Sequence, residues 1–109
     1  MTALLRSLAA GKLLSPSSSR YILDIMKQTV TFPDRLKAGL APSWTIAHKT
    51  GTSDTWKGVT AAPNDVGILS APDGRWIAIA VFVADSPAPD RARAALIASL
   101  AKATIAQYR

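Results

Sequence analysis

Lys49, Thr50 and Gly51 form a Lys-Thr-Gly triplet that closes an alternating stretch of the sequence. A lysine ammonium attracts a ligand carboxylate, and a threonine hydroxyl can donate a hydrogen bond to the same group. Glycine has no Cβ, so a ligand can lie against the strand backbone at this point. Three residues are a short match, so the triplet alone is compatible with a strand-end site for a small molecule that carries a carboxylate and with an ordinary strand end.

Groups that could act as nucleophile or base are scarce in this chain. The one Ser-x-x-Lys spacing, Ser99 to Lys102, lies far downstream, and any helix brings residues at this spacing together. The seven acidic residues are all aspartates, so no glutamate base is present. We expect His48 to hold its strand by a hydrogen bond, because its side chain should face away from Lys49. We expect Asp65 to be a structural hydrogen-bonding residue at the start of a strand.

Composition excludes several classes of site. Without cysteine and with a single histidine, the chain offers no disulfide and no ordinary metal site, so we expect neither a metal nor a cofactor. The net charge of +6 is spread without a basic run, which argues against a nucleic-acid partner. The longest apolar run, residues 76–84, is too short to cross a bilayer, and residues 1–10 carry no convincing export signal, so no membrane partner is expected.

The first part of the chain, residues 1–42, is predicted to be helical. Leucine spacing indicates a short helix over residues 1–14. Ser15 and Pro16 are typical of a helix start, and this second helix should run to about residue 28. A further turn or two is expected over 34–40. The apolar face of the second helix would consist of Tyr21, Ile22, Ile25 and Met26.

The second part, residues 43–109, is predicted to be a sheet followed by a long helix. Strands are expected over 44–50, 66–71 and 76–84, with a loop over 51–64 whose tip includes Lys57 and Gly58 and a tight turn over 72–75. The third strand is almost entirely apolar, which predicts a central strand covered on both faces. The last helix should span 89–108, with an apolar stripe of Ala92, Leu96, Leu100 and Ala103 and with Ile97 and Ile105 beside it.

These elements predict one α+β unit over residues 1–109. It would contain a three-stranded antiparallel sheet, short preceding helices and a long C-terminal helix on one face.

Four short motifs occur in a single register along this order of elements. They are the run from His48 to Ser53, the Asn-Asp-Val-Gly run from Asn64 to Gly67, the turn from Pro72 to Arg75, and the strand from Ala80 to Val83. Together they closely resemble the C-terminal part of class A serine β-lactamases, and in particular an extended-spectrum branch. The resemblance covers essentially the whole chain but only the last part of a complete family member.

The resemblance implies roles for individual residues. Lys49, Thr50 and Gly51 match the triplet that binds the β-lactam carboxylate. Thr52 matches the residue whose backbone N–H forms half of the oxyanion hole, where negative charge develops. Arg35 falls where some members place a second carboxylate-binding arginine. The full substrate-binding set implied is Lys49, Thr50, Gly51, Thr52, Ser53 and Arg35, with Ser53 at the pocket edge.

The resemblance also implies what is missing. The family's Ser-x-x-Lys nucleophile, Ser-Asp-Asn motif and base glutamate have no counterpart here. We therefore expect a chain that is inactive alone, exposes apolar surface, and self-associates or needs a partner chain. Complete members are periplasmic or secreted. The alternatives are a penicillin-binding or D,D-peptidase relative, a non-catalytic assembly module, and a basic nucleic-acid binder.

Overall fold

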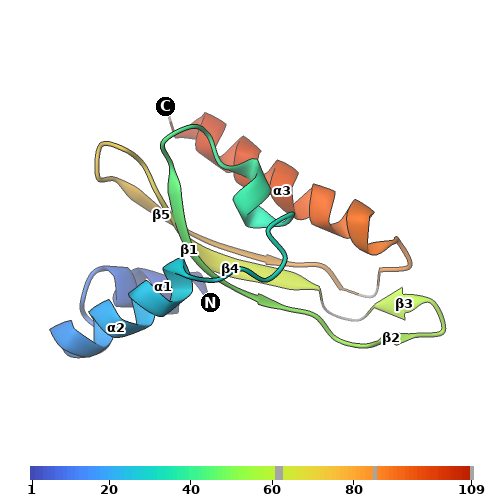
Figure 1. Ribbon diagram of the computed structural model, residues 1–109, viewed down its shortest axis with the longest axis horizontal. Coiled ribbons are helices and arrows are strands. Elements are labelled where there is room, and N and C mark those ends of the chain that lie inside the picture. The colour runs from blue at the N-terminus through green and yellow to red at the C-terminus, as the bar shows by residue number, and fades with distance from the viewer. Residues whose placement is uncertain (61–62, 85, 109) are drawn as a thin grey trace.

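A computed structural model describes residues 1–60, 63–84 and 86–108. The helices are α1 (Thr2–Ala9), α2 (Pro16–Lys27), the 3₁₀ helix η1 (Leu36–Gly39) and α3 (Asp90–Gln107). The strands are β1 (Thr45–Gly51), β2 (Thr55–Trp56), β3 (Val59–Thr60), β4 (Asn64–Ser70) and β5 (Trp76–Phe82). The predicted α+β class and the three-stranded antiparallel sheet are confirmed (Figure 1).

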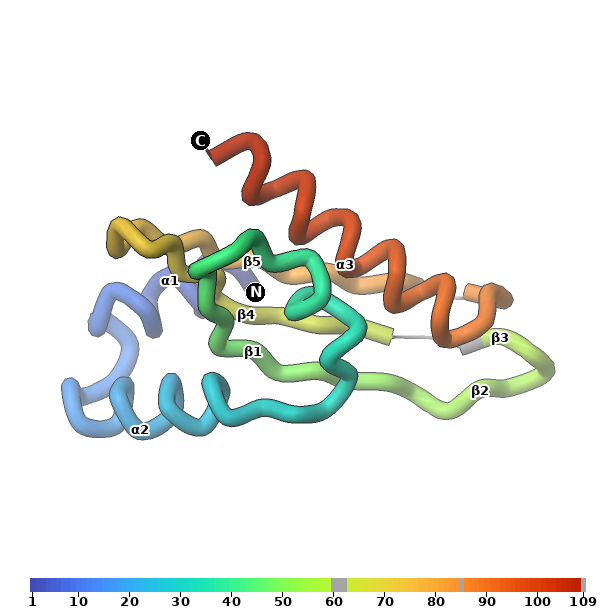
Figure 2. Tube along the Cα trace, turned by 45° about the horizontal axis from the view of Figure 1, so that its top comes forward, coloured from blue at the N-terminus to red at the C-terminus, as the bar shows by residue number. Residues whose placement is uncertain are grey.

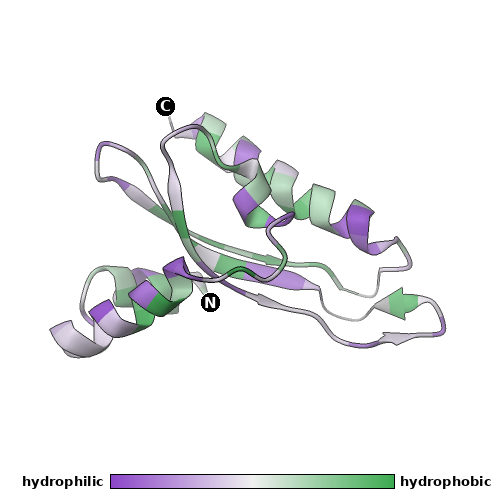
Figure 3. Cartoon of the chain, viewed as in Figure 1, coloured by the Kyte–Doolittle hydropathy of each residue, from purple (hydrophilic) through white to green (hydrophobic). Residues whose placement is uncertain are grey.

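The main sheet has the order β1-β4-β5, and both pairs are antiparallel. The prediction that the third strand is central was wrong, because β4 occupies the centre and β5 lies at an edge. Each strand pairs with the next through its own hairpin or loop, so the last strand must lie outside. Nonetheless β5 is hydrophobic along most of its length (Figure 3), because helices pack on both of its faces.

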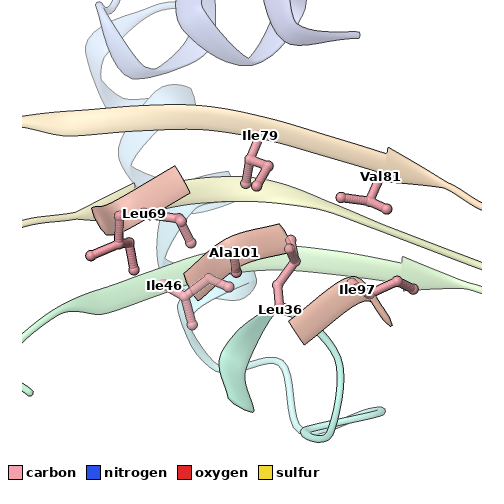
Figure 4. Close-up of a cluster of buried hydrophobic side chains, with 8 residues drawn as sticks. Leu36, Ile46, Leu69, Ile79, Val81, Ile97 and Ala101 are labelled. Atoms are coloured by element: carbon pink, nitrogen blue, oxygen red, sulfur yellow. The ribbon is translucent and has the colours of Figure 1, made fainter. Parts of the chain in front are cut away.

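The sheet lies between two layers of helix. α3 and η1 cover one face, while α1 and α2 contact the other (Figure 1). The main core forms on the α3 side, where strand alternation turns one set of side chains toward the helices (Figure 4). Its buried members are Leu36, Ile46, Leu69, Ile79, Val81, Ile97, Ala101 and Ile105.

Helix α2 begins where the sequence predicts. The Ser15 side chain accepts a hydrogen bond from the Ser18 N–H at 3.2 Å, and Pro16 occupies the first helical position. Its predicted apolar face, however, is not buried in this chain, since Tyr21 is 71% exposed and Ile25 is 50% exposed. The amphipathic pattern of α2 is therefore real, but only part of the surface it could cover lies in the described residues.

Helix α3 packs through a different stripe from the one predicted. The buried positions are Ile97, Ala101 and Ile105, whereas Leu96 and Leu100 are 49% and 42% exposed. Apolar residues lie almost all around this helix, so the sequence pattern alone does not distinguish the covered stripe from its neighbour. The contact with η1 determines which stripe of α3 is covered. A Cβ on Gly39 would overlap the Ala98 carbonyl oxygen, so the backbones of η1 and α3 lie very close.

The expected loop over 51–64 contains a small two-stranded ribbon, in which Thr55 pairs with Thr60 and Trp56 with Val59. Its turn is formed by Lys57 and Gly58, at the tip that the sequence predicts. Both have positive φ, +49° and +78°, which matches the turn type that closes two-residue hairpins. Positions 61 and 62 of the loop lie outside the described residues.

Candidate functional site

The outer edge of β1 is bordered by the segment 29–35, which connects α2 to η1 (Figure 2). The Thr29 hydroxyl donates a hydrogen bond to the His48 carbonyl oxygen at 2.7 Å. Two residues further along, the hydroxyls of Thr31 and Thr50 are hydrogen-bonded at 2.6 Å. These two contacts follow the two-residue repeat of β1, so the segment runs beside the strand while it crosses from one face of the sheet to the other.

The side chains of the triplet separate at the strand end. Thr50 is buried, at 5% exposure, on the same face as His48. Lys49 is exposed on the opposite face, and its Nζ reaches around the edge to donate to the Thr50 carbonyl oxygen at 2.5 Å. An ammonium held at an open strand edge can exchange this neutral acceptor for a ligand carboxylate, which is the stronger charge-assisted partner.

Arg35 lies directly against the end of β1. Its Nη1 donates to the carbonyl oxygens of Gly51 and Asn64 at 3.0 and 2.8 Å, and its Nη2 donates to the Thr52 hydroxyl at 2.6 Å. The guanidinium also stacks on Phe32, 3.8 Å from the ring centroid. The structure thus brings Arg35 together with Gly51 and Thr52, two of the residues that the sequence analysis assigns to the same site.

Arg35 is only 4% exposed, and this burial has an electrostatic consequence. Desolvation lowers the pKa of Arg35, while the nearby negative charges of Asp65 and Asp34 act in the opposite direction. The guanidinium has five N–H donors in a planar fork, and the three contacts above use only part of them. Through these three contacts it braces the end of β1.

His48 and Asp65 form a buried pair on the α3 side of the sheet. His48 Nδ1 lies 2.9 and 3.1 Å from the two carboxylate oxygens of Asp65, and the residues are 1% and 0% exposed. The expectation that each is a structural hydrogen-bonding residue agrees with this geometry. Gly67 permits it: a Cβ there would lie 2.5 Å from the Ala47 carbonyl oxygen and 2.7 Å from His48 Cβ.

The residues after the triplet lead from β1 into the ribbon. Thr52 is exposed apart from its contact with Arg35, and Ser53 is half-buried. At the ribbon tip Trp56 is 75% exposed, with Lys57 Nζ 5.8 Å from its ring centroid. The site is therefore the end of β1, between the segment 29–35 and the small ribbon.

Sequence reasoning missed Thr31, which contacts Thr50 of the triplet, and Thr29, which ties the same segment to the backbone of β1. Their spacing of two matches the spacing of His48 and Thr50, and that repeat could have indicated an extended segment paired with β1 through side chains. Nothing in the local sequence shows which strand such a segment borders.

Two kinds of feature are absent from the described part of the chain. Within residues 1–60, 63–84 and 86–108, no three histidine or acidic residues gather closely enough to hold a metal ion. In the same ranges, no helix combines the length and apolar character that crossing a bilayer requires.

Comparison with known proteins identifies relatives along the whole chain. The family model described as the β-lactamase enzyme family matches residues 1–108. β-Lactamase VEB-1 of Pseudomonas aeruginosa is 42% identical over 98 residues, which are 90% of this chain and 33% of that protein. Extended-spectrum β-lactamase PER-1 of the same species is 49% identical over 90 residues, 82% of this chain and 29% of that protein.

A solved structure shows the same architecture. The crystal structure of a β-lactamase from Chitinophaga pinensis superposes with a TM-score of 0.94 at 42% identity, covering 99% of this chain and 40% of the other. The TLA-1 extended-spectrum β-lactamase matches with a TM-score of 0.90, also at 42% identity, over 94% of this chain and 38% of the other. The chain spans about a third of the length of the curated relatives it matches.

Proposed function

Because the chain belongs to the β-lactamase enzyme family, we propose that it forms the C-terminal part of a serine β-lactamase that hydrolyses the β-lactam amide bond. The observation that carries the proposal is the strand end itself, where an exposed Lys49 lies next to a Thr50–Thr52 edge braced by Arg35. A β-lactam presents a carboxylate and an acyl carbonyl, and such an edge offers a cation for the first and a backbone donor for the second.

Lys49 would anchor the substrate carboxylate, assisted by Thr50, Arg35 and the half-buried Ser53. Lys49 Nζ already lies at the strand edge on a neutral carbonyl acceptor. If Thr31 donates to Thr50, the Thr50 hydroxyl hydrogen remains available for the ligand. Gly51, which has no side chain, would let the bound molecule approach the strand backbone.

Thr52 would supply one backbone N–H of the oxyanion hole. Thr29 bonds to the outward carbonyl of His48, and the backbone groups of every second residue along an edge strand face the same way. Thr50 follows His48 in this alternation and Thr52 would follow Thr50, so the Thr52 N–H would face the open edge. Arg35 on the Thr52 hydroxyl would fix that orientation before the substrate arrives.

Acylation would require groups outside this chain. The complete enzyme would use a serine nucleophile and then a glutamate-activated water to hydrolyse the acyl-enzyme, and the sequence contains no glutamate. The exposed apolar residues of α2 are a surface that the rest of such a protein, or a second chain, would cover. We expect the complete protein to be periplasmic or secreted, and the isolated chain to be inactive.

The test is hydrolysis of a chromogenic cephalosporin. It would be measured with the chain alone and with the chain combined with the part of VEB-1 that it does not match, called here the reconstituted protein. Activity only after reconstitution, lost in Lys49→Ala and retained in Lys57→Ala, is the expected result. Lys57 is the matched control because it is an exposed lysine on the neighbouring ribbon.

Two outcomes would contradict the proposal. Turnover by the pure chain alone that Lys49→Ala abolishes would show that no outside nucleophile is needed. A folded reconstituted protein without turnover would instead favour a non-catalytic assembly module.

A further inference from the structure

Asp65 is the most deeply buried charged residue near the strand end, at 0% exposure. It comes from β4 and lies opposite Thr50 of β1 and Val81 of β5 in the sheet register. A buried carboxylate is costly unless it is paired and hydrogen-bonded. The groups that surround Asp65 therefore indicate what the fold gains from placing it there.

One partner is the start of η1. The backbone N–H of Leu36, the first residue of this helix, donates to Asp65 Oδ2 at 3.2 Å. Arg35, at the N-cap position, makes no side-chain capping hydrogen bond of its own. Asp65 thus supplies from the sheet the acceptor that a capping serine or aspartate normally supplies locally.

The second partner is His48, which orients the carboxylate. His48 Nδ1 lies within hydrogen-bonding distance of both Asp65 carboxyl oxygens, so the ring fixes the orientation of the carboxyl group. Nε2 of His48 is buried, and no described residue offers it a hydrogen-bond partner. Within the described residues, the hydrogen bonds of the His48 ring therefore go to Asp65 alone, and Nε2 makes no contact that links the strands.

The third neighbour is Arg35 itself, the residue immediately before Leu36. The negative charge of Asp65 opposes the effect of burial on the Arg35 guanidinium. Arg35 reaches from this point to Gly51, Asn64 and Thr52. A small shift of the Arg35–Leu36 backbone would move the guanidinium away from all three acceptors together. The three nitrogen–oxygen distances of 3.0, 2.8 and 2.6 Å would then lengthen at the same time.

We propose that Asp65 is a positioning residue that caps η1 from the neighbouring strand and thereby sets where Arg35 lies against Gly51 and Thr52. Its effect on substrate rests on the proposed function, in which Arg35 and Thr52 serve the bound β-lactam. Its effect on the Leu36 N–H and on Arg35 does not depend on that function, so the two can be tested separately.

The experiment compares Asp65→Ala, which removes both acceptor oxygens, with Asp65→Asn, which keeps one acceptor for the Leu36 N–H. The control is Asp34→Asn, since Asp34 is an exposed carboxylate that also acts on Arg35 through its charge but makes no capping bond. Hydrogen exchange of the Leu36 amide is followed by NMR in the chain and in the reconstituted protein. Kinetics of a chromogenic cephalosporin are measured in the reconstituted protein.

We expect Asp65→Ala to accelerate exchange at the Leu36 amide about tenfold, because its hydrogen bond to the Asp65 side chain is lost. Asp65→Asn should have a smaller effect, and Asp34→Asn none. In the reconstituted protein, Asp65→Ala should raise KM about tenfold and Asp65→Asn should raise it less, with kcat changed much less in both, as expected when ground-state binding of the carboxylate is weakened. If Asp65 served only to stabilise the fold, its variants would lower the folded fraction without raising KM more than they lower kcat.

Unchanged exchange at the Leu36 amide in both Asp65 variants would overturn the proposal, as would an equal rise of KM in Asp34→Asn. If the unmodified reconstituted protein fails to hydrolyse the substrate, the proposed function is wrong. The exchange measurement still decides whether Asp65 caps η1 in that case.

Discussion

Thr31 and Thr50 lie hydroxyl to hydroxyl across the edge of β1, with their oxygens 2.6 Å apart. Thr31→Val should remove the partner that orients the Thr50 hydroxyl. We expect KM for a β-lactam to rise about fivefold and stability to fall by about 1 kcal/mol, the typical loss for one hydrogen bond. Thr29→Val is the matched control, because it removes a hydroxyl from the same segment that bonds only to the His48 backbone. It should match the stability loss and leave KM unchanged, and equal KM values for the two variants would contradict a role of Thr31 at the site.

Arg35→Lys preserves the charge but not the planar fork. A single ammonium cannot reach the Gly51 and Asn64 carbonyls and the Thr52 hydroxyl together from the same backbone position. We expect a loss of about 2 kcal/mol in the free energy of unfolding by urea. Arg75→Lys, at an exposed arginine on the hairpin turn, should change it by less than about 0.5 kcal/mol. If Arg35→Lys leaves the chain as stable as the original, these hydrogen bonds do not brace the strand end.

Gly67→Ala tests the close approach of β1 and β4. The added Cβ would lie 2.5 Å from the Ala47 carbonyl oxygen, so the strands must separate beside His48. Overpacking of this kind should cost about 2 kcal/mol. Gly11→Ala, where φ is +74° and no atom lies within 4 Å of the new Cβ, should cost about 1 kcal/mol from backbone strain alone. Urea titrations of both variants give the comparison, and the reverse order would refute the steric argument.

Asp73 gives the hairpin turn a predictable dependence on pH. The Arg75 backbone N–H, which donates to Asp73 at 3.0 Å, holds the pKa of this carboxyl below its ordinary value of 3.8. A carboxyl with a lowered pKa in the folded state stabilises the fold above the pKa of the unfolded chain and loses that effect as the pH falls through the folded value. The stability difference between the original chain and Asp73→Asn should therefore shrink as the pH falls below about 4. A difference independent of pH would contradict this.

The exposed apolar face of α2 should drive association of the isolated chain. Replacing Ile25, which is 50% exposed, with lysine should shift sedimentation toward the monomer. Gln28→Lys adds the same charge at the exposed, polar C-cap of the same helix and should leave association unchanged. If both variants remain associated, another surface is responsible.

The elements that the sequence predicts well are those whose determinants are local. Ser15 caps α2 through a backbone N–H three residues away, and Gly74, with φ of +91°, closes the turn after Pro72. The prediction of which α3 stripe is covered was wrong. Leu96 and Leu100 are as apolar as the buried Ile97 and Ile105, and only packing against η1 and the sheet distinguishes them. The prediction that β5 is the central strand was wrong for a related reason. An apolar strand indicates that its two faces are covered, and it does not indicate that both of its edges are paired.

The same distinction applies to the candidate site. Lys49, Thr50 and Gly51 are recognisable because they are contiguous in the sequence. The placement of Arg35 against Gly51, and of Thr31 against Thr50, depends on the path of the chain from α2 around the sheet edge to η1. No local pattern encodes that path, so the residues that support the triplet could be found only in three dimensions.

The two edges of the sheet are not equivalent. Along β1, the Thr29 hydroxyl binds the His48 carbonyl and the Thr31 hydroxyl binds the Thr50 side chain, so the segment 29–35 covers this edge, whereas no described strand pairs with the outer side of β5. The sheet can therefore be extended in one direction only, away from Lys49. A strand that pairs with β5, from the same protein or another, would lie on the far side of the sheet from the triplet. Strand addition and ligand binding therefore use opposite edges and do not compete for the same hydrogen-bonding groups.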